Sequence, residues 1–149
     1  LNAFFAFVAD ASSPRQFGPQ DLRVAAAVLL MHVVDADGRA SPAERDRLRS
    51  LLRERFALDD ASVRQLLDVA ARRDREALDS GEFALQLARA LDPDARRGVV
   101  AMLWEIARAD GRVSEVEESA IWRVARLLDV LDPKSFAEEA LRGEDDGAR

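Results

Sequence analysis

The sequence predicts an all-α protein, a compact bundle of seven to eight helices that contains an internal helix-turn-helix duplication. Three observations indicate this fold class. Apolar residues recur at helical spacing through most of the 149 residues, and no run of strand length alternates apolar and polar residues. A helix-turn-helix pattern from Ala25 to Leu52 returns from Val100 to Leu128, seventy-three positions later. The duplication predicts two similar helix pairs related by a pseudo-two-fold axis.

The two copies match most closely where their first helices end and their second helices begin. The matching positions are Asp37, Gly38, Ser41 and Glu44 in the first copy and Asp110, Gly111, Ser114 and Glu117 in the second. Glycine adopts the left-handed conformation that ends a helix without a side-chain clash. The Ser-x-x-Glu pattern is a capping box, which starts a new helix. Each copy is therefore predicted to be a helix, a tight turn and a capped helix.

The chain divides into three parts. Residues 1–20 are expected to hold an N-terminal helix, LNAFFAFVA, docked on the body, and a linker rich in Ser, Pro and Gly. An amphipathic or membrane-proximal anchor is the alternative for that helix. Residues 21–132 are expected to form the main domain, with repeats over residues 24–58 and 97–131. Residues 133–149 are expected to be a short C-terminal helix to Leu141 and an acidic, disordered tail.

The main domain has one predicted central helix in each repeat. The run from Val24 to Val34 is apolar except for His32, so its helix should be buried on nearly every side. It is shorter than the roughly 20 apolar residues that span a membrane. Asp92-Pro93 starts the corresponding helix of the second repeat. We expect these two helices to pair, with the capped helices around them. The sequence leaves open whether the two Asp-Gly turns share one end of the bundle.

The composition excludes several classes of function. There is no cysteine, which removes disulfides, thiolate metal sites and cysteine nucleophiles, and suits a cytoplasmic location. The net charge of −6 argues against nonspecific nucleic-acid binding, which depends on cationic neutralisation of phosphates. Nucleophilic-serine and phosphate-loop motifs are also missing. We therefore expect no enzymatic activity and no nucleic-acid partner.

The four repeated acids have two explanations. Asp37 and Asp110 lie at helix C-termini, where the helix dipole disfavours a negative charge by roughly 0.3–1 kcal/mol, so something should compensate. Each carboxylate could accept N–H groups of its own turn. Alternatively, Asp37, Glu44, Asp110 and Glu117 together could hold a divalent cation. Carboxylate oxygens without sulfur or histidine favour calcium, magnesium or manganese.

Better-known metal sites fit the sequence poorly. An EF-hand loop would place Val33 and Ile106 where it requires its first acidic ligand. A ferritin-like di-iron site needs Glu-x-x-His pairs, and His32 is the single histidine. We expect His32 to be hydrogen-bonded at the edge of the core. Its counterpart in the second repeat, Glu105, is expected to pair with Arg108 or Arg112.

At the residues DADGRASPAE and ADGRVSEVEE, the chain resembles the TerB-like family of tellurite-resistance proteins. The resemblance covers about Leu22 to Leu131 and is most specific at MLWEIARADGRVSEVE. It implies a bacterial, cytoplasmic, compact helical domain linked to tellurite and other stress responses and to membrane-associated complexes. The acidic positions of the family have been regarded as a possible metal site. Asp37, Glu44, Asp110 and Glu117 match that pattern in both halves.

Two functions of different classes follow. The first is a non-enzymatic TerB-like module of the stress response that binds a divalent cation or a protein partner, with a membrane-associated complex and a homodimer both open. The second is a structural interaction or dimerisation scaffold in which the acids only close turns and cap helices. A hydrolase that uses the carboxylates and a metal ion is a distant third. Direct tellurite chemistry finds no support, because the chain has no thiol.

Overall fold

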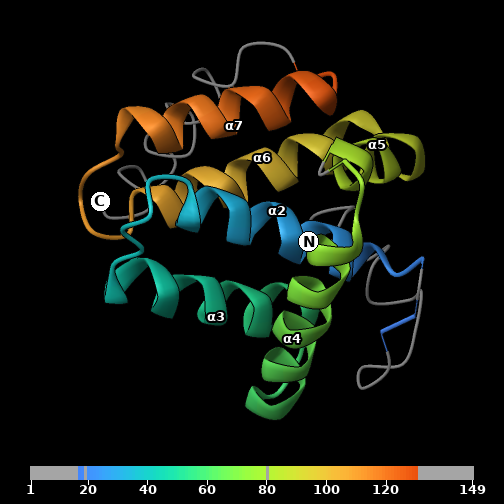
Figure 1. Ribbon diagram of the computed structural model, residues 1–149, viewed down its shortest axis with the longest axis horizontal. Helices are drawn as coiled ribbons and strands as arrows, with labels where there is room; N and C mark the ends of the chain where they lie inside the picture. The colour runs from blue at the N-terminus through green and yellow to red at the C-terminus, as the bar shows by residue number, and fades with distance from the viewer. Residues whose placement is uncertain (1–16, 19, 80, 131–149) are drawn as a thin grey trace, which may run out of the picture.

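The computed structural model describes residues 17–18, 20–79 and 81–130, and all regular secondary structure in this part of the chain is α-helical (Figure 1). The helices are α2 (Leu22–Asp35), α3 (Pro42–Phe56), α4 (Asp60–Glu76), α5 (Gly81–Ala90), α6 (Pro93–Ala107) and α7 (Glu115–Leu127). The described residues thus form six helices rather than the seven to eight predicted for the whole chain. The two further helices were predicted over residues 1–9 and from residue 133, and both ranges lie outside the described residues. None of the described helices is long and apolar enough to cross a membrane.

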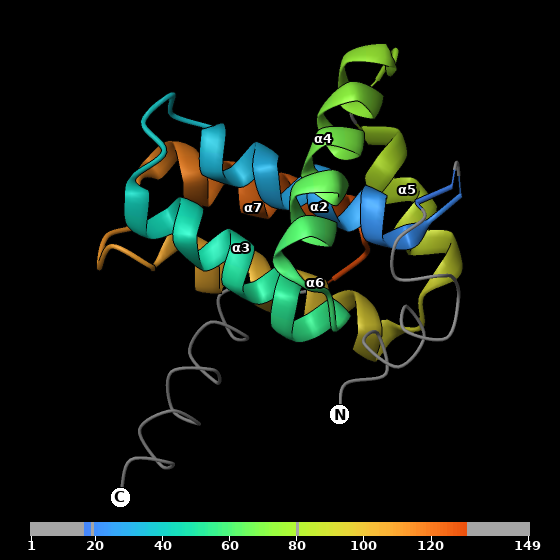
Figure 2. The same cartoon turned by 90° about the horizontal axis from the view of Figure 1, so that it is seen from below.

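Helix α2 lies at the centre of the bundle. It contacts each of the other five described helices, and its residues from Leu22 to Leu30 are all buried. This is the helix whose sequence is apolar on nearly every side, and burial on all sides is the arrangement in which such a helix is stable. Figures 1 and 2 show the other helices packed around it.

The two repeats pair as the duplication predicts. Helix α2 packs on α6, each capped helix packs on its own partner, and α3 contacts α6 as α7 contacts α2. Exchanging the two repeats leaves this set of contacts unchanged, which is the pattern of a pseudo-two-fold axis. The α2–α3 and α6–α7 turns lie at the same end of the bundle in both views (Figures 1 and 2). The structure thereby decides a point that the sequence left open.

Local chemistry starts the helices where the sequence indicates. The side chains of Asp21, Asp59 and Asp92 are N-caps that accept backbone N–H groups of α2, α4 and α6. Asp21 also holds Arg23, with 2.6 Å between its Oδ2 and the Arg23 Nη2. Arg23 is only 2% exposed, and its guanidinium lies over the Phe17 ring. A buried charge is tolerated here because it is paired and hydrogen-bonded.

Helices α4 and α5 connect the two repeats, and both contact α2. Helix α4 runs from Asp60 to Glu76, and α5 starts at Gly81. The Asp79 side chain accepts the Gly81 N–H at 2.9 Å, and this hydrogen bond lies at the start of α5. Both helices bury one apolar face against α2.

Candidate acidic site between the two repeats

Both Asp-Gly turns have the same conformation. Gly38 and Gly111 have φ values of +70° and +86°, the left-handed region that glycine enters without strain. The Oδ1 atom of Asp37 accepts the Arg39 N–H at 2.9 Å, and that of Asp110 accepts the Arg112 N–H at 3.1 Å. Each aspartate thus accepts an N–H group of its own turn. This hydrogen bond offsets the unfavourable interaction of its charge with the helix C-terminus.

The helices after the turns begin with complete capping boxes. The Ser41 hydroxyl accepts the Glu44 N–H at 3.1 Å, while Oε1 of Glu44 accepts the Ser41 N–H at 3.4 Å. The second repeat has the same two contacts, at 3.0 Å and 3.2 Å, between Ser114 and Glu117. In both glutamates the capping box uses one carboxylate oxygen, Oε1. The other oxygen, Oε2, takes no part in the capping box.

The two capping glutamates are buried and meet each other. Glu44 is 2% exposed and Glu117 is 3% exposed, which is rare for a glutamate. Their carboxyl groups are close enough to interact by hydrogen bonding and by charge. The Oε2 atoms of both residues are buried and have no hydrogen-bond partner among the residues that the structure describes. An oxygen in that position is costly unless a proton or a cation satisfies it.

The electrostatic consequence appears at Glu44. Burial raises the pKa of Glu44 to about 7. The Glu117 carboxyl acts in the same direction, because it can accept the proton of a neutral Glu44 and repels a charged one. The N–H of Ser41 lowers the pKa, because it stabilises the carboxylate, but its effect is smaller than that of burial. A pKa near neutrality means that the Glu44 carboxyl carries a proton for much of the time at pH 7. A protonated Glu44 can donate to Glu117.

The structure brings the four predicted site residues to one end of the bundle but does not place them in one cluster. Glu44 and Glu117 interact directly, whereas Asp37 and Asp110 stay in their own turns, each bound to a backbone N–H. Within the described ranges there is no group of three or more His, Asp or Glu side chains that could hold a metal ion. The divalent cation therefore stays a prediction.

Two other expectations concern the central helices. His32 lies at the edge of the core, as predicted, and its Nε2 atom is 2.8 Å from Oδ2 of Asp74 on α4. The prediction for Glu105 was wrong. Its carboxylate pairs with Arg55 at 3.2 Å and Arg47 at 3.5 Å, both on α3. The expected partners were neighbours in sequence, but Glu105 faces the helix packed beside it.

Sequence reasoning identified Glu44 and Glu117 as capping residues and offered a shared cation site as an alternative, but it left open whether the two caps meet. The missing step was geometrical. A signal was present, because residues at equivalent positions of two repeats come together when they lie close to the pseudo-two-fold axis. Their periodicity agrees with this, since Glu44 and Leu48 are spaced as one face of α3, and Glu117 and Ile121 as one face of α7.

The duplicated turns, the central helix pair and the buried glutamates define a class of protein, a small helical domain built from two fused helix-turn-helix repeats. A family model described as "Tellurite resistance protein TerB" matches residues 23–139. The chain belongs to the TerB family. No match is found among curated proteins or among solved structures.

Proposed function

We propose that this chain is a non-enzymatic TerB-family module of the tellurite and stress response, and that Glu44 and Glu117 bind a divalent cation between its two repeats. The observation that carries the proposal is the pair of buried Oε2 atoms that lack a hydrogen-bond partner among the described residues. Helix capping explains the Oε1 atoms but leaves these two oxygens unexplained. A cation shared by both carboxylates would satisfy the two oxygens together.

The charge of the site supports the same proposal. Burial is the main cause of the raised pKa of Glu44, and repulsion from the Glu117 carboxylate adds to it, so ionising both groups is costly. A divalent cation removes that cost, because metal ligation favours the deprotonated form. Cation binding should therefore release a proton near neutral pH. Bound there, the cation would link the start of α3 to the start of α7.

The donor set favours a small, hard cation. Mg²⁺ is commonly bound by one or two carboxylates and keeps several waters, whereas Ca²⁺ takes about six to eight oxygen ligands. Two glutamates with no histidine or sulfur suit Mg²⁺, or Mn²⁺, better than Zn²⁺. Asp37 and Asp110 lie at the same end and each commits one oxygen to its turn. We assign them a supporting electrostatic role.

A scaffold without metal is the alternative, and a specific observation favours it. Each Asp carboxylate and each Glu Oε1 already accepts an N–H group, so most of the acidic oxygens have ordinary structural roles. In that case Glu44 and Glu117 would share a proton, and the module would act through protein partners, in a membrane-associated complex or as a homodimer. A cytoplasmic location belongs to both versions.

Thermal unfolding of the chelator-stripped protein, with and without millimolar Mg²⁺, Mn²⁺ or Ca²⁺, tests the proposal. A ligand at 100 times its dissociation constant adds about 2.7 kcal/mol, which for a domain of this size raises Tm by roughly 5–10 °C. The Glu44→Gln/Glu117→Gln variant should lose this shift. Glutamine keeps the capping box, so the loss would report on the charge rather than on the caps.

The Asp37→Asn/Asp110→Asn variant is the matched control. Asparagine keeps the oxygen that accepts the turn N–H, and the cation-dependent shift should persist in this variant if the two glutamates are the ligands. Loss of the shift in both variants would support the four-acid site instead. If no ion raises Tm in the unmodified protein, the cation proposal is wrong and the scaffold is favoured.

A further inference from the structure

A cavity of about 260 Å³ opens between α2, α5 and α7. Its walls are mostly apolar and include Leu29 of α2, Ala84 of α5 and Ala120 of α7. Of the described residues that line it, His32 and Arg123 are ionisable and none is acidic. We call this surface the α2–α7 groove. The groove is thus apolar and without acidic side chains, in a chain whose net charge is −6.

Helix α7 contributes an exposed apolar strip to this groove. Val116, Ala120 and Leu127 line it and are spaced by four and seven residues, so they share one side of the helix. Val116 is 48% exposed and Leu127 is 39% exposed, although both are large apolar side chains. At about 1.5 Å per residue the strip is roughly 17 Å long. It therefore offers about three helical turns of apolar surface that the described residues leave partly uncovered.

The other half of the bundle provides an internal comparison, because α3 contacts α6 as α7 contacts α2. The seventy-three-residue shift pairs the groove positions with polar residues on that face, namely His32 with Glu105, Ala120 with Arg47, Arg123 with Ser50 and Leu127 with Glu54. There the Glu105 carboxylate binds Arg47 and Arg55, and these ion pairs join the two helices. The same helix arrangement therefore forms without an apolar strip, and the strip is specific to the α2–α7 face.

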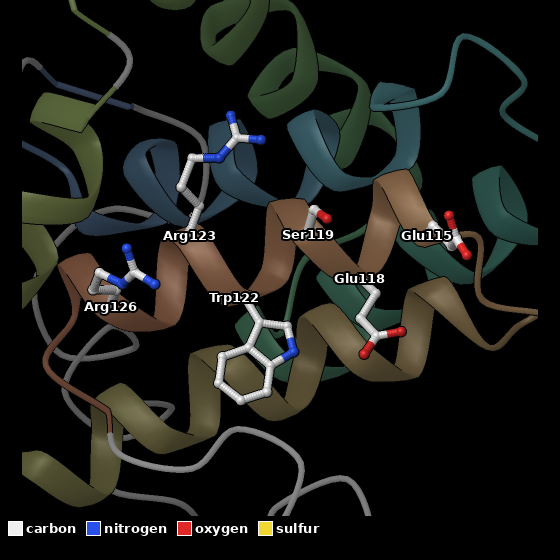
Figure 3. Close-up of a pocket in the computed structure, with 6 residues that line it drawn as sticks. All are labelled: Glu115, Glu118, Ser119, Trp122, Arg123 and Arg126. Carbon is white, nitrogen blue, oxygen red and sulfur yellow. The ribbon is translucent and has the colours of Figure 1, made fainter.

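Arg123 gives the groove its charge. It projects from α7 toward α2, whereas Trp122 projects to the opposite side, where a shallow hollow is lined by α7 residues of both charges (Figure 3). Among the described residues, no acidic side chain pairs with Arg123. His32, by contrast, is bound to Asp74 of α4 at 2.8 Å. The groove therefore presents a cation beside its apolar strip, and an acidic side chain of a partner would complement that cation.

The size of the cavity favours protein side chains over a small ligand. Pockets that enclose drug-sized ligands measure about 300–1,000 Å³, and this cavity is smaller. It suits one or two anchor side chains, while the exposed Val116 and Leu127 extend the contact along α7. An apolar strip of three helical turns is the surface on which an amphipathic helix lays its apolar side.

We propose that the α2–α7 groove binds an amphipathic helix of a partner protein, with its apolar side on the α7 strip and an acidic side chain against Arg123. A second copy of this chain is a poorer occupant, because an isologous contact would bring two Arg123 side chains to one interface. Neither Glu44 nor Glu117 lines the groove, so the proposal does not depend on the cation site.

NMR titration of the ¹⁵N-labelled full-length protein tests the proposal. The probes are two synthetic helix-forming peptides, identical except that one carries glutamates and the other lysines beside a stripe of leucines. The glutamate peptide should shift the amide signals of groove residues, including Leu29 and Ala120. If neither peptide shifts these signals at millimolar concentration, the proposal is wrong. Shifts of the same signals on dilution of the protein alone would show that a second copy occupies the groove, which would also overturn it.

Charge reversal on α7 separates the contact at Arg123 from the overall charge. Arg123→Glu and Arg126→Glu each lower the net charge by two, but Arg126 does not line the groove. Physiological salt screens charges more than about 8 Å apart. Under these conditions Arg123→Glu should lower the ratio of glutamate-peptide to lysine-peptide affinity about fivefold relative to Arg126→Glu, as expected for an exposed ion pair. Equal ratios in the two variants would contradict the contact at Arg123.

The apolar strip is tested by the Val116→Gln/Leu127→Gln variant. Glutamine favours helix and adds no charge, so the variant should fold, as far-UV circular dichroism checks, and should bind both peptides about tenfold more weakly. Leu85→Gln is the matched control, because Leu85 is 43% exposed on α5 and does not line the groove. It should bind as the unmodified protein does. If the control weakens binding as much as the double variant, the strip is not the docking surface.

Discussion

At the residue scale, Glu44 serves two purposes that act on its charge in opposite directions. As a capping residue it accepts the Ser41 N–H, which favours the carboxylate. As a buried residue beside Glu117 it is disfavoured in the charged form, and this effect is larger, since the pKa rises to about 7. The same side chain thus helps to start α3 and places a titrating group between the repeats.

The stability of the metal-free protein should therefore depend on pH in a particular direction. Between pH 4.5 and about 7 the folded protein retains a proton on Glu44 that the unfolded chain releases. The stability that this proton provides is complete below pH 4.5 and is lost as the pH rises toward 7. At about 1.4 kcal/mol per pKa unit, the loss is roughly 3 kcal/mol. Urea unfolding in the presence of a chelator, at pH 5 and at pH 8, measures it.

Glu44→Gln should remove this part of the pH dependence and should be more stable than the unmodified protein at pH 8, because glutamine keeps the cap without a charge. Glu54→Gln, at an exposed position of the same helix, is the control and should behave as the unmodified protein. If the free energy of unfolding of Glu44→Gln still differs between pH 5 and pH 8 by as much as that of the unmodified protein, another group is responsible.

At the scale of elements, each repeat relies on its capping box to restart the chain after the turn. The two boxes use the same residues and nearly the same distances. The caps place each glutamate in the first turn of its helix. The packing of the two repeats then puts both turns at the same end of the bundle (Figure 1) and brings the two glutamates together.

Removing either cap should destabilise the fold by a similar amount. Ser41→Ala and Ser114→Ala each remove the acceptor for an N–H of the first turn, and the expected cost is about 1 kcal/mol each. Ser119→Ala, at an exposed position within α7, is the matched control and should be neutral or slightly stabilising because alanine favours helix. Midpoints of chemical unfolding report these differences. If Ser119→Ala lowers the stability as much as Ser114→Ala does, the capping role of Ser114 is contradicted.

At the scale of the whole molecule, α2 joins all the described helices into one core. It contacts both capped helices, both connecting helices and its counterpart α6. The molecule should consequently unfold in one step, because no described helix keeps its apolar face covered once α2 is lost. The two repeats are therefore not independent units, although they are similar in sequence.

Substitution of Leu30 tests this role of α2. Leu30 is fully buried, so Leu30→Ala should lower the free energy of unfolding by about 3–5 kcal/mol, through lost burial and an incompletely filled cavity. Leu85→Ala, on α5, removes the same atoms from a side chain that is 43% exposed and should cost under about 1 kcal/mol. Coincident unfolding curves from far-UV circular dichroism and tryptophan fluorescence are expected, and separated curves would show that the repeats unfold independently.

Local chemistry explains what the sequence by itself determined. Gly38 and Gly111 are needed for a left-handed turn, Ser41 and Ser114 for the caps, and the apolar run of α2 for a central helix, and each feature depends on residues within a few positions of one another. The helix-turn-helix pair of each repeat and the packing of α2 on α6 followed from these patterns, as did the resemblance to the TerB family. The predicted turn and cap contacts of Asp37, Glu44, Asp110 and Glu117 are all present.

Only the tertiary structure decided which of these residues meet. The side of the bundle shared by the two turns, the contact of Glu44 with Glu117 and the pairing of Glu105 with Arg47 and Arg55 all join residues that are fifty or more positions apart. Such contacts depend on how whole helices pack, and a capping pattern has the same sequence whether its glutamate faces solvent or another carboxylate. The raised pKa of Glu44 is likewise a property of burial, which the packed helices create.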